Sequence, residues 1–150
     1  MNDEAKQRAL KILDRRDVSR KMLLDKLTEK GISNTDAEEV ADWLCGLGVV
    51  NDERFAGLVV RHYAAKGYGV RKIQDEFFKR RVPRDCWGQA LEQLEAPDET
   101  IDRLIEKKLR GKEVDRKELN RVSAFLARRG FSWNDIREGL ARYGASLEEP

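Results

Sequence analysis

Apolar residues recur at three- and four-residue steps along the whole chain, which is the spacing of one face of an α-helix. Ala5, Ala9 and Leu13 show this spacing near the N-terminus, and Ile101 and Ile105 show it in the last third of the chain. No stretch alternates apolar and polar residues as a half-buried strand does. The pattern therefore predicts an all-α fold.

The helical pattern occurs three times. When Gly31-Ile32, Arg81-Val82 and Gly130-Phe131 are aligned, 50 and 49 residues apart, eight columns are apolar in all three copies. The columns are Ala5/Phe55/Leu104, Leu10/Val60/Leu109, Leu23/Ile73/Val122, Leu27/Phe77/Leu126, Ile32/Val82/Phe131, Ala37/Trp87/Ile136, Ala41/Leu91/Leu140 and Leu44/Leu94/Tyr143. Because tandem repeats pack mainly on their neighbours, we expect an elongated array of three repeats, at residues 1–50, 51–97 and 98–150.

Each repeat is expected to contain three helices, with a helix-turn-helix geometry between the second and the third. The expected helices are 4–14, 19–30 and 36–46, then 52–65, 70–80 and 86–94, then 99–110, 116–129 and 135–143. The second helices are expected to begin near Ser19, Gly69 and Asp115. A ninth column of N-cap residue types, Thr35, Asp85 and Asn134, is expected to begin the third helices, and Glu38 completes a capping box with Thr35.

Charge is sorted along the chain although the net charge is only +2. Residues 54–84 hold 9 basic and 2 acidic residues, and residues 103–129 hold 10 basic and 4 acidic ones. Residues 85–102, between them, hold 6 acidic residues and no basic one. A basic surface suits phosphate or an acidic protein groove, although charge runs are also ordinary solvated faces. We predict a binding surface made of Arg61, Lys66, Arg71, Lys72, Lys79, Arg84, Lys108, Arg110, Arg116 and Lys117.

The sequence contains no recognisable catalytic or metal-binding constellation. His62 has no nucleophile or carboxylate partner at a recognisable spacing, and Cys45 and Cys86 lack the spacing of a zinc site. Gly67-Tyr68-Gly69 lacks the strand before it and the Gly-Lys-Ser/Thr after it that a phosphate loop needs. We therefore predict a protein that is not an enzyme and that uses no cofactor or metal.

The length of the apolar runs and the N-terminal residues predict the location of the protein, and the tryptophan positions predict part of its core. The apolar runs are too short to span a membrane, and the charged N-terminal residues do not form a signal peptide, so a cytoplasmic protein is expected. The three tryptophans, Trp43, Trp87 and Trp133, fall at apolar positions and are expected in the core, with an exposed Trp133 as the alternative.

Three stretches of the chain resemble the bacterial RecX regulatory proteins. They are Arg15-Arg16-Asp17-Val18-Ser19-Arg20-Lys21-Met22-Leu23-Leu24-Asp25-Lys26-Leu27, then Val50-Asn51-Asp52-Glu53-Arg54-Phe55-Ala56 with Lys66-Gly67-Tyr68-Gly69, and Arg128-Arg129-Gly130-Phe131-Ser132-Trp133-Asn134-Asp135-Ile136. The middle block is the most specific. Two positions depart from the family pattern, because Asn51 stands where members often have an acidic residue and Arg81 stands in a glycine's place.

The resemblance implies tandem three-helix repeats and a function in regulating the RecA recombinase. A protein of this kind would bind the RecA filament and inhibit its recombinase, ATPase and coprotease activities. Separately from the resemblance, we expect a monomer that binds no membrane. The alternative from the residues alone is a helix-turn-helix module that binds single- or double-stranded DNA directly.

Overall fold

The computed structural model describes residues 1–148 and confirms the all-α fold. It contains α1 (Asp3–Arg15), α2 (Arg20–Glu29), α3 (Asn34–Gly46), α4 (Asp52–Ala65), α5 (Val70–Lys79), a 3-10 helix (Arg84–Cys86), α6 (Trp87–Leu91), α7 (Asp98–Leu109), α8 (Arg116–Arg128) and α9 (Trp133–Glu148). No residue of this described range lies in a strand.

The chain divides into two compact units. The first unit comprises Met1–Val59 and Glu76–Ala90, and the second comprises Val60–Asp75 and the described residues from Leu91 onward. The division passes through α4 and α5, so the middle set of helices contributes to both units.

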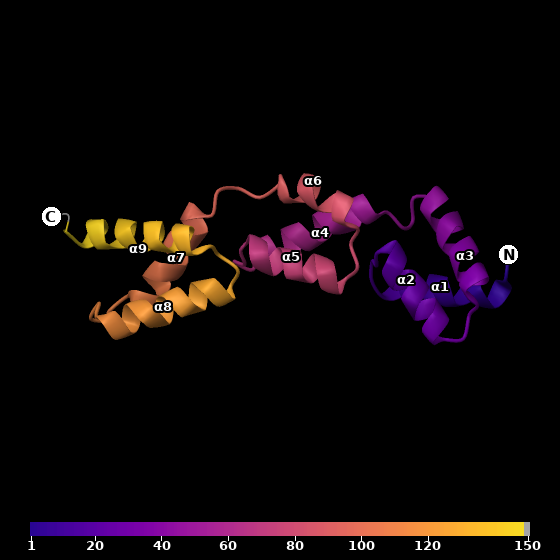
Figure 1. Cartoon of the computed structure of the whole chain (residues 1–150), viewed down its shortest axis with the longest axis horizontal. Coiled ribbons are helices and arrows are strands. Elements are labelled where there is room, and N and C mark those ends of the chain that lie inside the picture. Colours follow the sequence, from indigo (N-terminus) through magenta and orange to yellow (C-terminus); the bar gives the residue numbers. More distant parts are fainter. Residues whose placement is uncertain (149–150) are drawn as a thin grey trace. The chain divides into compact units, whose positions relative to one another are not determined.

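The first unit is built around α1, α2 and α3, which pack on one another (Figure 1). Leu23 and Leu27 of α2 meet Val40 and Leu44 of α3 in a core in which each is at most 1 % exposed. Leu10 lies at an expected core position but is 45 % exposed. It is the only member of the eight apolar columns that faces solvent; the others are buried or half-buried.

The second unit has its largest helix pair in α7 and α9 (Figure 1). Gly139 of α9 is buried at this contact, where an added Cβ would lie 2.5 Å from Ile101 Cγ2 and 3.1 Å from Ile105 Cδ1. The lack of a side chain at Gly139 therefore permits the close approach of the two helices. Leu126 and Ile136 complete the core and are fully buried.

The expected N-caps of the third helices are wrong by two residues. Ser33 and Ser132 are the residues that accept the N–H groups of Asp36 and Asp135, each at 3.1 Å. Both helices therefore begin before the expected caps Thr35 and Asn134, and the capping box of Thr35 and Glu38 does not form. In the middle repeat, Asp85 lies inside a 3-10 turn that follows Pro83, without a side-chain cap.

The second helices begin as expected. Ser19 accepts the N–H of Met22 at 3.2 Å, and Asp115 accepts the N–H of Glu118 at 2.9 Å.

The prediction that Trp133 lies in the core is wrong. Trp133 is the first residue of α9 and its side chain is 56 % exposed.

Arg81 lies two residues beyond the end of α5 in a left-handed conformation, with φ of 56°. It is the only residue other than glycine with a positive φ among those that the structure describes. The N–H of Arg81 donates to the carbonyl of Phe78 and the N–H of Val82 donates to that of Phe77, at 3.1 and 2.9 Å, which is the hydrogen-bond pattern of a helix C-terminus that ordinarily holds glycine. The guanidinium of Arg81 lies 2.6 Å from the carboxylate of Asp25.

We expect Arg81→Gly to raise the free energy of unfolding by about 0.5–1 kcal/mol. The left-handed conformation costs a side-chain-bearing residue about 1–2 kcal/mol, whereas an exposed ion pair contributes about 0–1 kcal/mol. Chemical denaturation measures the difference, and Arg81→Ala, which keeps the strain and loses the pair, should be no more stable than the parent. A glycine variant less stable than the alanine variant would show that the conformation is not strained.

Candidate interaction surface

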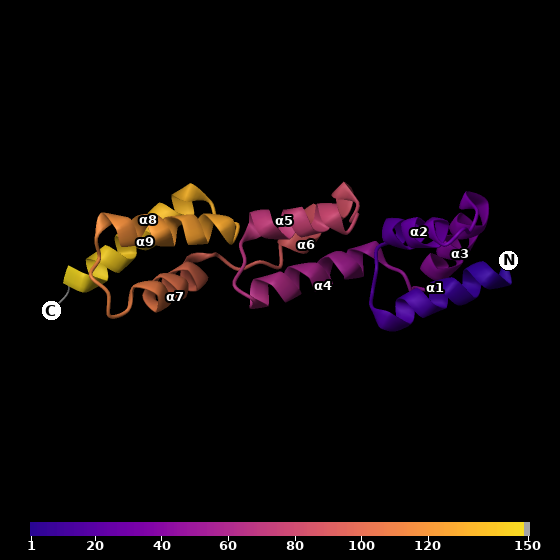
Figure 2. The same ribbon diagram turned by 90° about the horizontal axis from the view of Figure 1, so that it is seen from below.

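The end of α8 joins the beginning of α5 within the second unit (Figure 2). The N–H of Gly69 donates to the carbonyl of Arg129 at 2.7 Å, and the N–H of Arg71 donates to that of Gly130 at 3.2 Å. These bonds pair donors that a helix start leaves free with acceptors that a helix end leaves free. A Cβ on Gly130 would lie 2.5 Å from the nitrogen of Lys72, so the two backbones meet without room for a side chain.

A related junction in the first unit uses side chains. The hydroxyl of Ser19 donates to the carbonyl of Arg80 at 2.6 Å, beyond the end of α5. Asp52 accepts the backbone N–H of Arg20 at 2.8 Å, and Ser19 is fully buried. These contacts tie the beginning of α2 to α4 and to the end of α5.

The first part of the block most specific to the resembled family, around Asn51 and Arg54, has a structural role in this chain. Asn51 accepts the N–H of Arg54 at 2.9 Å and so caps α4, which explains why an amide serves at this position. Arg54 in turn donates to the carbonyls of Gly48 and Val49, both at 2.8 Å, where α3 has ended. These residues fix the connection between α3 and α4 and are not free to bind a partner.

A basic–aromatic patch lies on the second unit beside the junction of α5 and α8. We define it as Tyr63, Tyr68, Lys72, Lys108, Phe125 and Arg129. The guanidinium of Arg129 stacks between the rings of Tyr68 and Phe125, at 4.4 and 5.2 Å from their centroids, and donates to the carbonyl of Lys66 at 2.9 Å. The ammonium groups of Lys72 and Lys108 lie over ring faces as well, Lys72 5.8 Å from the centroid of Tyr68 and Lys108 4.3 Å from that of Phe125.

A basic groove of about 340 Å³ adjoins this patch between α7 and α8. Lys108 and Phe125 belong to both the patch and the groove, and the other charged residues of the groove are Lys112, Arg121, Arg128 and Glu118. Glu118 lies 3.4 Å from Arg121 and 3.8 Å from Lys112. With four cations and one carboxylate, the groove favours anionic groups.

The structure brings only part of the predicted surface together. Lys72 and Lys108 belong to the patch, and the backbones of Lys66 and Arg71 hydrogen-bond to Arg129 and Gly130 beside it. Four other members are exposed, but each already has a partner within the chain. Arg110 pairs with Glu106 at 3.1 Å, and Lys79 lies 3.8 Å from Glu76. Arg61 donates to Gln93 at 2.8 Å, and the guanidinium of Arg84 stacks over the ring of Trp87 at 4.7 Å from its centroid. Lys79 and Arg84 belong to the first unit, and Arg61 lies on the wall of a hollow described below.

Three members of the predicted surface occupy first turns of helices. Arg71 is the second residue of α5, and Arg116 and Lys117 are the first two of α8. All three are exposed. A cation at a helix N-terminus opposes the helix dipole at a cost of about 0.3–1 kcal/mol. Residues that break a local rule of stability are typical of functional positions.

The sequence missed Arg129 and its aromatic partners. Tyr68 and Phe125 are separated by 57 residues, and only the junction of α5 with α8 brings them to one cation. The single signal available was Arg129 next to Gly130 at the end of a basic helix, and that signal does not identify a partner.

No group of three or more metal-ligating side chains occurs in the part of the chain that the structure describes. Burial raises the pKa of the thiols of Cys45 and Cys86, which keeps both protonated at neutral pH and makes them poor nucleophiles. None of the described helices is both long enough and apolar enough to cross a bilayer.

Comparison with known proteins matches the chain to three consecutive domains of one family. Residues 5–44, 51–91 and 96–140 match the first, second and third three-helix domains of RecX. The regulatory protein RecX of Chromohalobacter salexigens is 33% identical over 135 residues, which are 89% of this chain and 88% of that protein. The chain belongs to the RecX family. It is a regulatory protein of three tandem three-helix domains.

Other RecX proteins give the same result. Regulatory protein RecX of Vibrio campbellii is 32% identical over 141 residues, covering 91% of this chain and 90% of its own. The crystal structure of RecX from Lactobacillus salivarius superposes with a TM-score of 0.83 at 23% identity, over 93% of this chain and 94% of that one. At 23% identity, the likeness to the Lactobacillus salivarius structure supports the RecX fold and not the role of any single residue.

Proposed function

We propose that this protein binds the RecA nucleoprotein filament and inhibits its recombinase, ATPase and coprotease activities. Membership of the RecX family supports a regulatory role, and the observation that carries the proposal further is the basic–aromatic patch with its adjoining groove. A filament of protein and DNA offers both phosphates and acidic side chains to such a surface. The action needs no catalytic residue, cofactor or metal of its own, and a monomer in the cytoplasm suffices for it.

The mechanism is a shift of population. A ligand that binds one filament state better than another moves the equilibrium by its difference in affinity. We propose that this chain favours a filament state of low ATPase activity. The exposed cations at the first turns of α5 and α8 would then make contacts that differ between the two filament states. Their position at helix N-termini lowers the stability of this chain, so a role in binding would account for it.

Direct binding of single-stranded DNA is the second candidate. Aromatic rings beside a basic groove are the usual means by which proteins hold single strands, and Tyr68 and Phe125 flank Arg129 next to such a groove. This candidate predicts binding that falls steeply with salt and does not require RecA.

We expect Arg71→Glu combined with Arg116→Glu to raise the concentration needed for half-inhibition of the RecA ATPase about tenfold at low salt, which corresponds to about 1.4 kcal/mol. The effect should shrink at high salt because ions screen the lost contacts. The same variant should unfold at a free energy equal to or slightly above that of the parent, since glutamate at a helix N-terminus is favourable. Lys72 is left unchanged because it packs against two rings.

The matched control is Lys21→Glu. Lys21 is exposed in the first turn of α2, outside both basic segments. As a single substitution it should gain about half of that stability, without any change in inhibition. If the double variant inhibits RecA like the parent at low salt, the cations at the first turns of α5 and α8 are ordinary solvated charges and do not provide the differential contact.

A further inference from the structure

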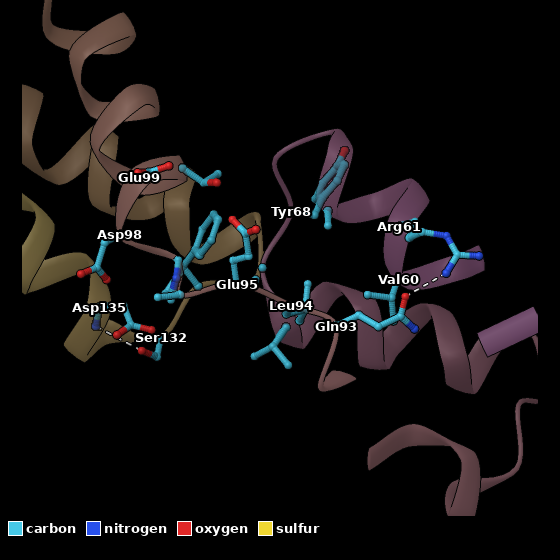
Figure 3. Close-up of a pocket in the computed structure, with 18 residues that line it drawn as sticks. Val60, Arg61, Tyr68, Gln93, Leu94, Glu95, Asp98, Glu99, Ser132 and Asp135 are labelled. Carbon is cyan, nitrogen blue, oxygen red and sulfur yellow. Dashed lines mark hydrogen bonds between the residues drawn. The ribbon is translucent and has the colours of Figure 1, made fainter. Parts of the chain in front are cut away.

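A hollow of about 800 Å³ lies within the second unit and shares one residue, Tyr68, with the basic–aromatic patch (Figure 3). The end of α4, the beginning of α5, the connection at 92–97 and the beginnings of α7 and α9 surround it. Its walls are apolar at depth, because Val60 and Phe131 are 1 % and 5 % exposed, and Leu94 is half-buried. Its size is within the range of ligand pockets.

Carboxylates from three separate elements line this hollow. Glu95 comes from the connection, Asp98 and Glu99 from the first turn of α7, and Asp135 from the first turn of α9 (Figure 3). Asp98 has a distant ion pair, 3.9 Å from Arg142. Within residues 1–148, no ion pair neutralises Glu95, Glu99 or Asp135.

Among the described residues that line the hollow, Arg61 is the one cation, and its side chain already has a hydrogen-bond partner. The guanidinium of Arg61 donates to the side-chain oxygen of Gln93 at 2.8 Å, on the side of the hollow opposite to Asp98 and Glu99 (Figure 3). The hollow is therefore apolar inside, negative at its rim and without an internal counter-ion near three of its carboxylates.

We propose that this hollow is a docking site for an arginine side chain presented by a protein partner. The methylene groups of arginine cover apolar walls while the charged end stays at a polar rim. The guanidinium is planar, carries five N–H donors and binds carboxylates at more than one position, which suits acidic groups that come from three elements. The proposal goes beyond the basic surface: the partner bound by this chain must also present a basic residue.

The first test is an NMR titration of the whole chain with Nα-acetyl-arginine methylamide. We expect the amide resonances of Val60, Glu95 and Phe131 to shift, with a dissociation constant in the millimolar range. Nα-acetyl-citrulline methylamide has the same shape without the charge, and it should bind at least fivefold more weakly. Equal shifts with both probes, or none with either, would overturn the proposal. Stronger shifts with Nα-acetyl-glutamate methylamide would overturn it too, because they would assign the hollow to an anion at the start of α7.

The second test is a pair of variants with equal charge change. Glu95→Gln with Glu99→Gln should weaken arginine-probe binding at least threefold. Glu92→Gln with Glu113→Gln removes two exposed carboxylates outside the hollow and should leave binding unchanged. Equal affinity in both variants would overturn the proposal. RecA is absent from these titrations, so failure here is distinct from failure of the proposed filament regulation.

Discussion

Replacement of Phe77 by alanine is expected to lower the free energy of unfolding by about 3–5 kcal/mol, the usual cost of removing a buried phenylalanine. Phe77 is fully buried on α5, and its ring centroid lies 5.3 Å from that of Trp87. The loss combines the apolar surface returned to water with the cavity left behind. Denaturation in urea followed by circular dichroism measures it.

Phe78 supplies the matched control. It is the next residue of the same helix and is 77 % exposed. Phe78→Ala should therefore change the free energy of unfolding by less than about 0.5 kcal/mol. A cost below about 1 kcal/mol for Phe77→Ala would contradict the helical register derived from the apolar columns.

Replacement of Gly130 by alanine is expected to cost about 2–5 kcal/mol. Gly130 has φ of 97°, and an added Cβ would meet the nitrogen of Lys72 at 2.5 Å and its Cβ at 2.9 Å. The left-handed conformation accounts for about 1–2 kcal/mol, and the overlap at the junction of α5 and α8 accounts for the rest.

Gly31 separates these two contributions. It ends α2 as Gly130 ends α8, with φ of 90°, but nothing lies within 4 Å of its added Cβ. Gly31→Ala should therefore cost only the conformational share of about 1–2 kcal/mol. Equal losses in the two alanine variants would show that the backbones at the junction of α5 and α8 do not meet closely.

Local periodicity was enough to predict which segments are helical, because the apolar face of a helix repeats within a dozen residues. The helix expected at 86–94 is shorter than predicted, since a 3-10 helix occupies Arg84–Cys86 and α6 ends at Leu91. Phe77 and Leu126, at one aligned column, are both fully buried, as the repeat predicts. The predicted starts of the third helices in the first and last repeats are wrong because two oxygen-bearing side chains stand near each start. Ser33 and Ser132 accept the capping hydrogen bonds, and Thr35 and Asn134 do not. Choice between such neighbours depends on the path of the preceding turn, which the pattern does not encode.

The candidate surface was only partly predictable. Charge counts located the two basic segments, and Lys72 and Lys108 do lie in the patch. The counts could not show that Arg110 and Lys79 pair with Glu106 and Glu76 on their own helices. Aromatic contacts of a cation depend on residues brought together from different repeats, so they emerge only once the junction of α5 and α8 is known.

Co-sedimentation measures whether the protein binds the RecA filament. The protein is centrifuged at one low salt concentration with RecA filaments assembled on single-stranded DNA, with the bare DNA and alone. We expect it to pellet with the filaments well above the bare-DNA level, and Arg71→Glu with Arg116→Glu to reduce that pelleted fraction while Lys21→Glu does not. Equal pelleting with bare DNA and with filaments would contradict filament recognition and assign the basic surface to DNA alone.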